Sequence, residues 1–181
     1  MIILRELKEK DSLYMIEWMH DKEIQKCFKK NMLDLNLEDA RRFCIEGAIP
    51  DKIKQGISIH YAITDDTDEY LGTISLKNID LINENAEFSI VVRRKMQGRG
   101  VAYEATKQLL RNAFIKYGLN RIYLNVLSDN YNAIRLYNRV GFVFEGEFKE
   151  HIKLGDIYKD WKWYAILRSD YLKRNDDKNE R

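Results

Sequence analysis

Two glycines near the middle of the chain stand where a phosphate group could bind. Residues 90–92 are β-branched and predict a buried strand, while apolar residues recur at helical spacing from 102 to 117. Gly98 and Gly100 therefore occupy a turn that leads into a helix N-terminus. Such a turn offers unpaired N–H groups and the positive end of the helix dipole, and glycine lets an anion approach the backbone closely. An ordinary strand-to-helix turn is the alternative interpretation.

The spacing of these glycines argues against two nucleotide sites. A dinucleotide fingerprint needs a third small residue, and here that position holds Tyr103. The sequence also contains no G-x-x-x-x-G-K-[ST] run, which excludes a P-loop.

Two segments instead resemble the signatures of the GNAT superfamily of acyl-CoA-dependent N-acyltransferases. Residues 97–102 match Gln/Arg-x-x-Gly-x-Gly/Ala, the superfamily's coenzyme A pyrophosphate motif, and residues 130–142 match N-x-x-A-x-x-L-Y-x-[KR]-x-G-F. The resemblance implies acetyl-CoA as cosubstrate and no metal. It places the cofactor contacts at Val91, Val92, Gln97, Gly98, Arg99, Gly100, Val101, Ala102 and Asn130.

Details around the motifs are similar to the ribosomal-protein-alanine N-acetyltransferase branch. They include Glu87 within Ala-Glu-Phe, Glu104 within Tyr-Glu-Ala, and the pair Glu145-Gly146; Asn138 departs from the pattern, where an acidic residue is common. That branch also holds polyamine and amino-sugar acetyltransferases. The acceptor is therefore a protein N-terminus, a polyamine or an amino sugar, and the sequence leaves this choice open.

Acetyl transfer to an amine requires two proton movements. The thiolate of coenzyme A, whose thiol has a pKa of roughly 8.5, leaves more easily when it is protonated. Tyr137 occupies the tyrosine position of the second signature and is the predicted acid, with ordinary core packing as the alternative.

The amine, with a pKa of about 10, must lose a proton before it attacks. Glu87 is the predicted base, because the alternation of residues 86–92 places it on the strand face opposite Phe88. A solvent-facing structural glutamate is equally compatible with this pattern. His60, on another strand, and a bound water remain alternatives for the base.

Composition limits the other classes. The chain has 181 residues and a net charge of +2 with both signs interspersed, which indicates one domain and disfavours a nucleic-acid partner. Residues 93–95 are a local basic run that serves either as a solvated turn or to attract coenzyme A phosphates. Neither a signal peptide nor a membrane-spanning run is evident, so we expect a cytoplasmic monomer or homodimer without a membrane partner. Trp18, Trp161 and Trp163 are expected in the core, with an acceptor pocket as the alternative.

The pattern of elements predicts an α+β fold. Strands are expected at 1–7, 57–64, 71–76, 86–92, 121–127, 142–148 and 157–167, and helices after Asp11, from 35, from 101 and over 130–140. The resemblance implies a twisted mixed, mostly antiparallel sheet of about seven strands with splayed central strands, flanked by about four helices. Residues 1–172 form the predicted domain, followed by a charged tail, 173–181, expected to be disordered.

A protein of a different class remains possible on the same fold. A non-catalytic acyl-CoA-binding regulatory module would keep residues 97–102 and lose Tyr137 or its surroundings, whereas this chain retains both.

Overall fold

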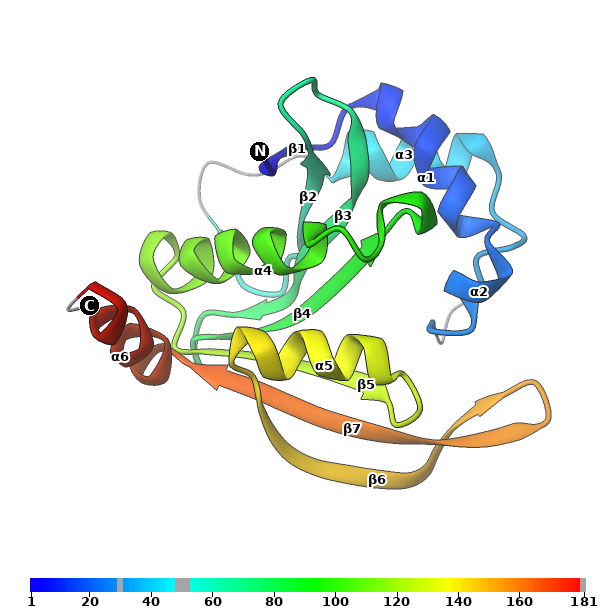
Figure 1. Cartoon of the computed structure of the whole chain (residues 1–181). Coiled ribbons are helices and arrows are strands. Elements are labelled where there is room, and N and C mark those ends of the chain that lie inside the picture. The colour runs from blue at the N-terminus through cyan, green and yellow to red at the C-terminus, as the bar shows by residue number, and fades with distance from the viewer. Residues whose placement is uncertain (29–30, 48–52, 180–181) are drawn as a thin grey trace.

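A seven-stranded sheet forms the centre of the molecule, in the order β1-β2-β3-β4-β5-β7-β6. The computed structural model describes residues 1–28, 31–47 and 53–179 (Figure 1). The strands are β1 Ile3–Glu6, β2 Ile59–Thr64, β3 Tyr70–Asp80, β4 Asn85–Val92, β5 Arg121–Leu127, β6 Val143–Leu154 and β7 Ile157–Leu167. Neighbouring strands are antiparallel except β4 and β5, which run parallel. The predicted mixed, mostly antiparallel α+β sheet is confirmed.

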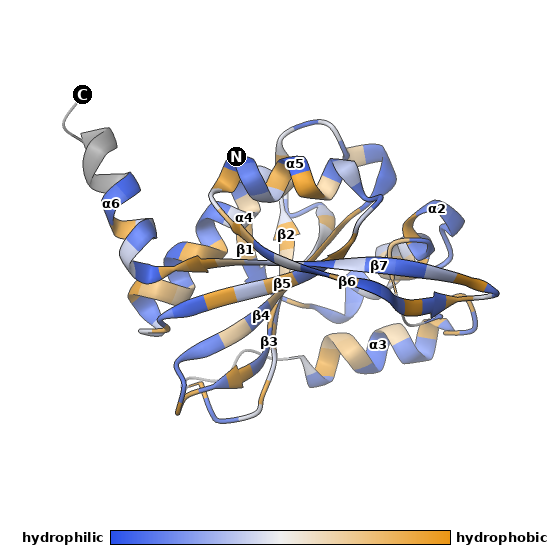
Figure 2. Ribbon diagram, turned by 90° about the horizontal axis from the view of Figure 1, so that it is seen from below, coloured by the Kyte–Doolittle hydropathy of each residue, from blue (hydrophilic) through white to orange (hydrophobic). Residues whose placement is uncertain are grey.

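Helices cover both faces of this sheet (Figures 1 and 2). They are α1 Ser12–Met19, α2 Lys22–Gln25, α3 Leu37–Glu46, α4 Val101–Arg111, α5 Tyr131–Val140 and α6 Arg168–Asn179. A π-helical turn, Asn112–Lys116, continues α4, and short 3-10 turns span Glu9–Asp11 and Arg94–Met96. The described residues thus contain six α-helices rather than about four, because α2 is a single turn and α6 occupies most of the charged tail.

The two sheet faces carry separate cores. Helices α4 and α5 cover a large core that includes Ile74, Phe88 and Leu124. On the other face, Met15 and Trp18 of α1 pack with Ala40 and Cys44 of α3 and with Ala62 of β2. Alternate residues of each strand supply the two cores, as the period of a strand requires.

The sheet opens between β4 and β5. These strands pair through only three residues, Asn85↔Arg121, Ala86↔Ile122 and Glu87↔Tyr123. Beyond the Glu87↔Tyr123 pair, β4 continues to Val92 and β5 continues to Leu127 without pairing to each other. We call the space between these unpaired halves the wedge. The splayed central strands expected from the resemblance are present.

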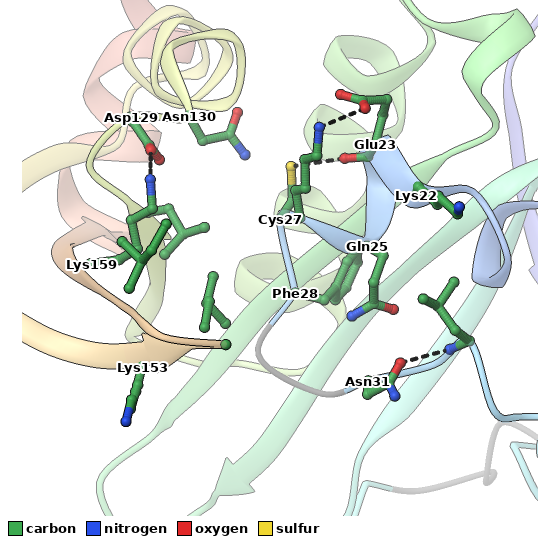
Figure 3. Close-up of a pocket in the computed structure, with 16 residues that line it drawn as sticks. Lys22, Glu23, Gln25, Cys27, Phe28, Asn31, Asp129, Asn130, Lys153 and Lys159 are labelled. Carbon is green, nitrogen blue, oxygen red and sulfur yellow. Dashed lines mark hydrogen bonds and ion pairs between the residues drawn. The ribbon is translucent and has the colours of Figure 1, made fainter.

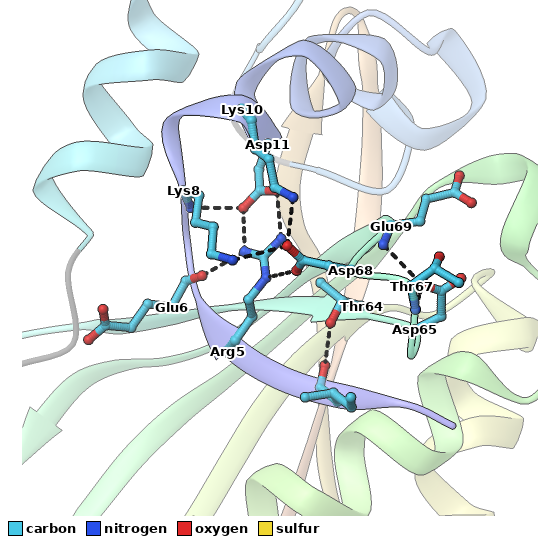
Figure 4. A network of polar contacts seen from close by, with 11 residues as sticks. Arg5, Glu6, Lys8, Lys10, Asp11, Thr64, Asp65, Thr67, Asp68 and Glu69 are labelled. Carbon is cyan, nitrogen blue, oxygen red and sulfur yellow. Dashed lines mark hydrogen bonds and ion pairs between the residues drawn. The ribbon is translucent and has the colours of Figure 1, made fainter.

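Asp11 stands at the N-cap position of α1, but its side chain has another role. It makes no capping bond; both carboxylate oxygens bind Arg5, at 2.7 and 2.9 Å, and one also accepts a bond from the Lys8 N–H at 2.8 Å (Figure 4). Arg5 also contacts Asp68 in the β2–β3 turn. Because the Asp11 carboxylate is fully buried, it needs a charged partner, and the ion pair with Arg5 satisfies it better than a helix-capping hydrogen bond would.

The structure also differs from the sequence prediction in the tail. A disordered segment was expected from Lys173, whereas α6 runs to Asn179. Residues 168–179 contain neither glycine nor proline, so nothing in the sequence interrupts the helix. Residues 180–181 lie outside the described part. The boundary of the domain at 172 stays a prediction.

Candidate active site

Strand β4 presents unpaired backbone groups to the wedge. The Arg93 N–H donates to the Leu71 carbonyl at 2.9 Å, which fixes the phase of the β3–β4 ladder. By the alternation of an antiparallel ladder, Val91 pairs with β3, while the N–H and C=O groups of Phe88, Ile90 and Val92 face the wedge. Apart from the Val92 carbonyl, which accepts a bond from the Gln97 side chain, these groups can pair with the amides of an extended ligand.

This phase separates two predicted cofactor contacts. Val92 offers its backbone to the wedge, and its carbonyl accepts a bond from the Gln97 side chain at 3.1 Å. The Val91 carbonyl instead approaches β3 so closely that a Cβ on Gly72 would collide with it. Ile90, rather than Val91, therefore presents its backbone to the wedge beside Val92. The alternation of the strand was visible in the sequence, but the phase of its hydrogen bonds was not.

The predicted phosphate turn ends directly at α4. Gly98 and Gly100 have φ of +74° and +79°, and no atom lies within 4 Å of a Cβ built on either glycine. This left-handed conformation strains other residues, and the open space leaves the backbone accessible. The first α4 bond is donated by Glu104 to Gly100, so the N–H groups of 101–103 precede the helical ladder. Arg99, Val101 and Ala102 belong to this same turn.

Asn130 begins α5 beside the end of β5. Its side-chain oxygen accepts a bond from the Ala133 N–H at 3.2 Å, which caps the helix. The amide oxygen is thus used by the fold, while the side-chain NH₂ remains to meet a ligand. The sequence analysis predicted this residue as a cofactor contact but not as a cap.

Tyr137 projects from α5 onto the wedge side of β4. Its ring packs edge-on against Phe88, the first unpaired residue of β4, and against Phe142, at centroid distances of 5.9 and 5.8 Å. The side chain is 8% exposed, and its hydroxyl makes no hydrogen bond to any residue that the structure describes. Burial raises the pKa of Tyr137, and the nearby Cys27 adds to this. The phenol therefore stays protonated at neutral pH and can donate a proton or a hydrogen bond.

Glu87 lies on the opposite face of the sheet. As the last paired residue of β4, it stands at the apex of the wedge. One carboxylate oxygen contacts Lys77 at 2.7 Å and the other accepts a bond from Asn78 at 3.1 Å. Both oxygens are occupied, and the Glu87 side chain is 18% exposed. The structure thus separates the predicted base from the predicted acid by the thickness of the sheet.

His60 shares the sheet face of Glu87. Its Nδ1 lies 2.8 Å from the Ser75 hydroxyl, and its ring packs against Phe43 of α3. Burial, helped by the charge of Lys77, lowers the pKa of His60 to about 4. The imidazole is neutral near pH 7, but such a low pKa makes it a weak proton acceptor.

The basic run after β4 is occupied by internal contacts. Arg93 is 2% exposed and contacts Glu17 of α1, Glu69 at 3.1 Å and the Tyr70 carbonyl at 2.9 Å. Lys95 also contacts Glu69, at 3.1 Å. This arginine joins α1 to the end of β4, so attraction of coenzyme A phosphates is not its role.

A pocket of about 780 Å³ opens between α2, the β5–α5 loop and the tip of the β6–β7 hairpin (Figure 3). We call it the side pocket. Its lining includes Lys22 and Cys27 from α2 and the residues after it, Asn130 at the start of α5, and Lys153 and Lys159 from the hairpin. Of the predicted cofactor contacts, Asn130 alone belongs to the lining. Its walls come from segments without a regular pattern, so the sequence does not show how they meet.

The tryptophans lie elsewhere. Trp18 is buried and donates to the Tyr70 hydroxyl at 3.0 Å, as expected for the core. Trp161 and Trp163 form a row of aromatic rings with Phe148 along β7 and β6. None of the three lines the side pocket.

The model of the acetyltransferase (GNAT) domain family matches residues 1–143. The chain belongs to the GNAT acetyltransferase family. This GNAT chain is 34% identical over 116 residues to the spermidine N(1)-acetyltransferase of Vibrio cholerae, covering 64% of this chain and 67% of that protein. It is 27% identical over 100 residues to the putative ribosomal N-acetyltransferase YdaF of Bacillus subtilis, covering 55% of each.

A solved relative extends the likeness to the whole GNAT fold. The crystal structure of spermidine N-acetyltransferase from Vibrio cholerae in complex with CoA and spermine superposes with a TM-score of 0.83 at 26% identity. It covers 94% of this chain and 98% of the other. Within the described part of the chain, none of the helices is long and apolar enough to cross a membrane, and no cluster of metal-binding side chains occurs.

Proposed function

We propose that this protein transfers an acetyl group from acetyl-CoA to the primary amine of a small-molecule or peptide acceptor by direct attack in a ternary complex. One observation carries the proposal: β4 and β5 separate after Glu87, and Tyr137 lies against the first unpaired residue of β4. The wedge gives an extended thioester a backbone edge to pair with. The protonated phenol then stands beside the path of the thioester.

In the proposed reaction the acceptor nitrogen attacks the thioester carbonyl carbon, and the carbon–sulfur bond breaks as the amide forms. The departing thiolate accepts a proton or a strong hydrogen bond from Tyr137. An ordinary tyrosine has a pKa about 1.5 above that of a thiol, so full transfer is uphill by about 2 kcal/mol. Burial raises the pKa of Tyr137 further, which favours a strong hydrogen bond to the thiolate over full proton transfer.

The second proton leaves the attacking amine. Glu87 is the proposed acceptor of this proton through water, since its place at the wedge apex brings it nearest to the point where the strands divide. Its contact with Lys77 opposes this role, because an ammonium competes for the carboxylate lone pairs. A water chain that ends on Glu87 or His60 is the alternative route.

The relatives support a small amine as acceptor. Three relatives, from Vibrio cholerae and two strains of Escherichia coli, are named spermidine N(1)-acetyltransferases, and the solved neighbour holds CoA and spermine. Another relative is a ribosomal-protein-serine acetyltransferase. The acceptor class of this chain therefore remains among polyamines, amino sugars and protein N-termini.

An acceptor screen tests the proposal. Acetyl-CoA is incubated with spermidine, glucosamine and a short peptide with a free N-terminus, and release of free thiol is followed. Acceptor-dependent thiol release that is lost in Tyr137→Phe is the expected result. Tight acetyl-CoA binding without thiol release from any amine would instead favour the non-catalytic acyl-CoA-binding module.

A further inference from the structure

We propose that the side pocket selects an amine whose molecule carries a phosphate group, such as an amino-sugar phosphate, rather than a polyamine. This inference rests on the proposed acetyl transfer and names the acceptor class. It follows from the charges that line the pocket.

The position of the side pocket suits the acceptor. Asn130 stands at the pocket edge and also belongs to the second GNAT signature, so the pocket adjoins the wedge. Leu127, the last residue of β5, also lines the pocket. A volume of about 780 Å³ falls in the range that small-molecule ligands occupy. An acceptor in this pocket therefore lies at the wedge end of β5 and at the start of α5, the helix that carries Tyr137.

The charged lining of the pocket is mainly basic. Four of its residues are lysines and two are acids, which leaves a net charge of +2. Both acids are already paired: Glu23 with Lys26 at 2.6 Å, and Asp129 with Lys159 at 2.5 Å. The remaining ammonium groups, on Lys22 and Lys153, make no ion pair with any described residue.

These unpaired lysines come from opposite walls of the pocket. Lys22 belongs to α2, whereas Lys153 stands near the tip of the β6–β7 hairpin, with its ammonium 5.6 Å from the Tyr158 ring centroid (Figure 3). Both side chains are exposed, and a lysine stem is long and flexible. A phosphate that enters between the walls can therefore recruit either ammonium or both.

The coenzyme A phosphates do not explain this charge. Their predicted site is the turn at 97–102, and none of those residues lines the side pocket. A polyamine fits the charge poorly, because each of its ammonium groups would meet an excess of positive charge and no unpaired carboxylate. An acceptor with a phosphate group meets complementary charge instead.

Matched amines provide the first test. Glucosamine 6-phosphate against glucosamine, and phosphoethanolamine against ethanolamine, differ only by the phosphate. We expect the KM of each phosphorylated amine to be about tenfold or more below the KM of its unphosphorylated partner. The kcat/KM for spermidine should be lower than the kcat/KM for either phosphorylated amine. Rising salt should reduce the preference. A preference for spermidine, or equal KM values within each pair, would overturn the inference while leaving acetyl transfer intact.

Charge reversal provides the second test. Lys22→Glu and Lys153→Glu should each raise the KM for the phosphorylated amine about three- to tenfold, with kcat and the KM for acetyl-CoA unchanged. Lys153→Arg should retain binding, and Lys173→Glu on the remote α6 is the matched control. If the charge reversals raise the KM for acetyl-CoA instead, the lysines bind the cofactor and the inference fails.

A binding measurement separates this inference from the proposed function. Calorimetric titration of glucosamine 6-phosphate into the CoA-loaded protein does not need turnover. Binding that Lys22→Glu and Lys153→Glu weaken supports the pocket assignment even if no amine is acetylated. Absence of binding, or binding that neither reversal alters, refutes it.

Discussion

Replacing Tyr137 by phenylalanine separates its chemical role from its structural one. The substitution keeps the ring and its edge contacts with Phe88 and Phe142. It removes a hydroxyl that has no hydrogen bond to the described residues. The free energy of unfolding should change by less than about 1 kcal/mol, which corresponds to at most about 2–4 °C in Tm.

The expected effect on rate is much larger. A donor directed at the developing thiolate acts where charge forms in the transition state, and loss of one such donor typically costs about 2.7–4 kcal/mol, or 10²–10³ in kcat. The Kd for acetyl-CoA should stay the same, since the bound thioester is neutral at sulfur. Loss confined to the transition state lowers kcat and kcat/KM together.

The pH dependence follows from the raised pKa of Tyr137. A tyrosine with a folded pKa above 10 keeps its proton through the alkaline range, so wild-type kcat should not fall between pH 7 and 10 because of this group. Thiol release at saturating acetyl-CoA and acceptor measures the rate. Tyr131→Phe, which removes an exposed hydroxyl from the same helix, is the matched control. A Tyr137→Phe rate within about threefold of wild type would refute the acid assignment.

The remaining predictions concern the cofactor turn and the sheet face of Glu87. Bound acetyl-CoA should raise the free energy of unfolding by about 2.7 kcal/mol at a hundredfold excess over Kd, and so raise Tm. Gly100→Val should abolish this rise in Tm because a side chain would fill the open approach, whereas Gly118→Val, with a similar φ of +69°, should keep it. Glu87→Gln should lower kcat at neutral pH, with partial recovery at high pH, where more amine is deprotonated. If Glu87→Gln and Lys77→Met lower kcat equally, and the pH profile stays parallel to wild type, the ion pair between these residues is structural. His60 binds its proton more weakly in the folded protein, so the free energy of unfolding should fall by about 1–2 kcal/mol as the pH drops from 6.5 towards 4, after allowance for partial exposure. Urea unfolding of His60→Gln should show a free energy of unfolding that depends less steeply on pH. An equally steep pH dependence in this variant would contradict the pKa assignment.

The elements with strong local patterns were predictable from the sequence. Strands β5 and β7 begin and end at the predicted residues, because apolar alternation and flanking polar residues both mark them. Helix α5 ends at Gly141, which adopts the left-handed conformation expected after a helix. The turn at Gly98 and Gly100 has the predicted open geometry.

Features that depend on distant residues were not predictable. Asp11 resembles a helix cap in sequence, but its partner Arg5 becomes apparent only when β1 and the first helical turn are brought together. Arg93 resembles a phosphate ligand until Glu17 and Glu69 are placed around it. The side pocket is built from three separate segments, and no local pattern specifies how they meet.

The alternation of β4 bears on how this family can vary in sequence. Half of the strand's backbone groups bind β3, and the other half, on Phe88, Ile90 and Val92, face the wedge. Backbone groups are the same for every residue type except proline. Substitutions among apolar side chains on this strand can therefore accumulate through evolution without altering what a ligand in the wedge meets. Side-chain identity matters instead in the glycine turn and in α5, where the two GNAT signatures of this chain lie.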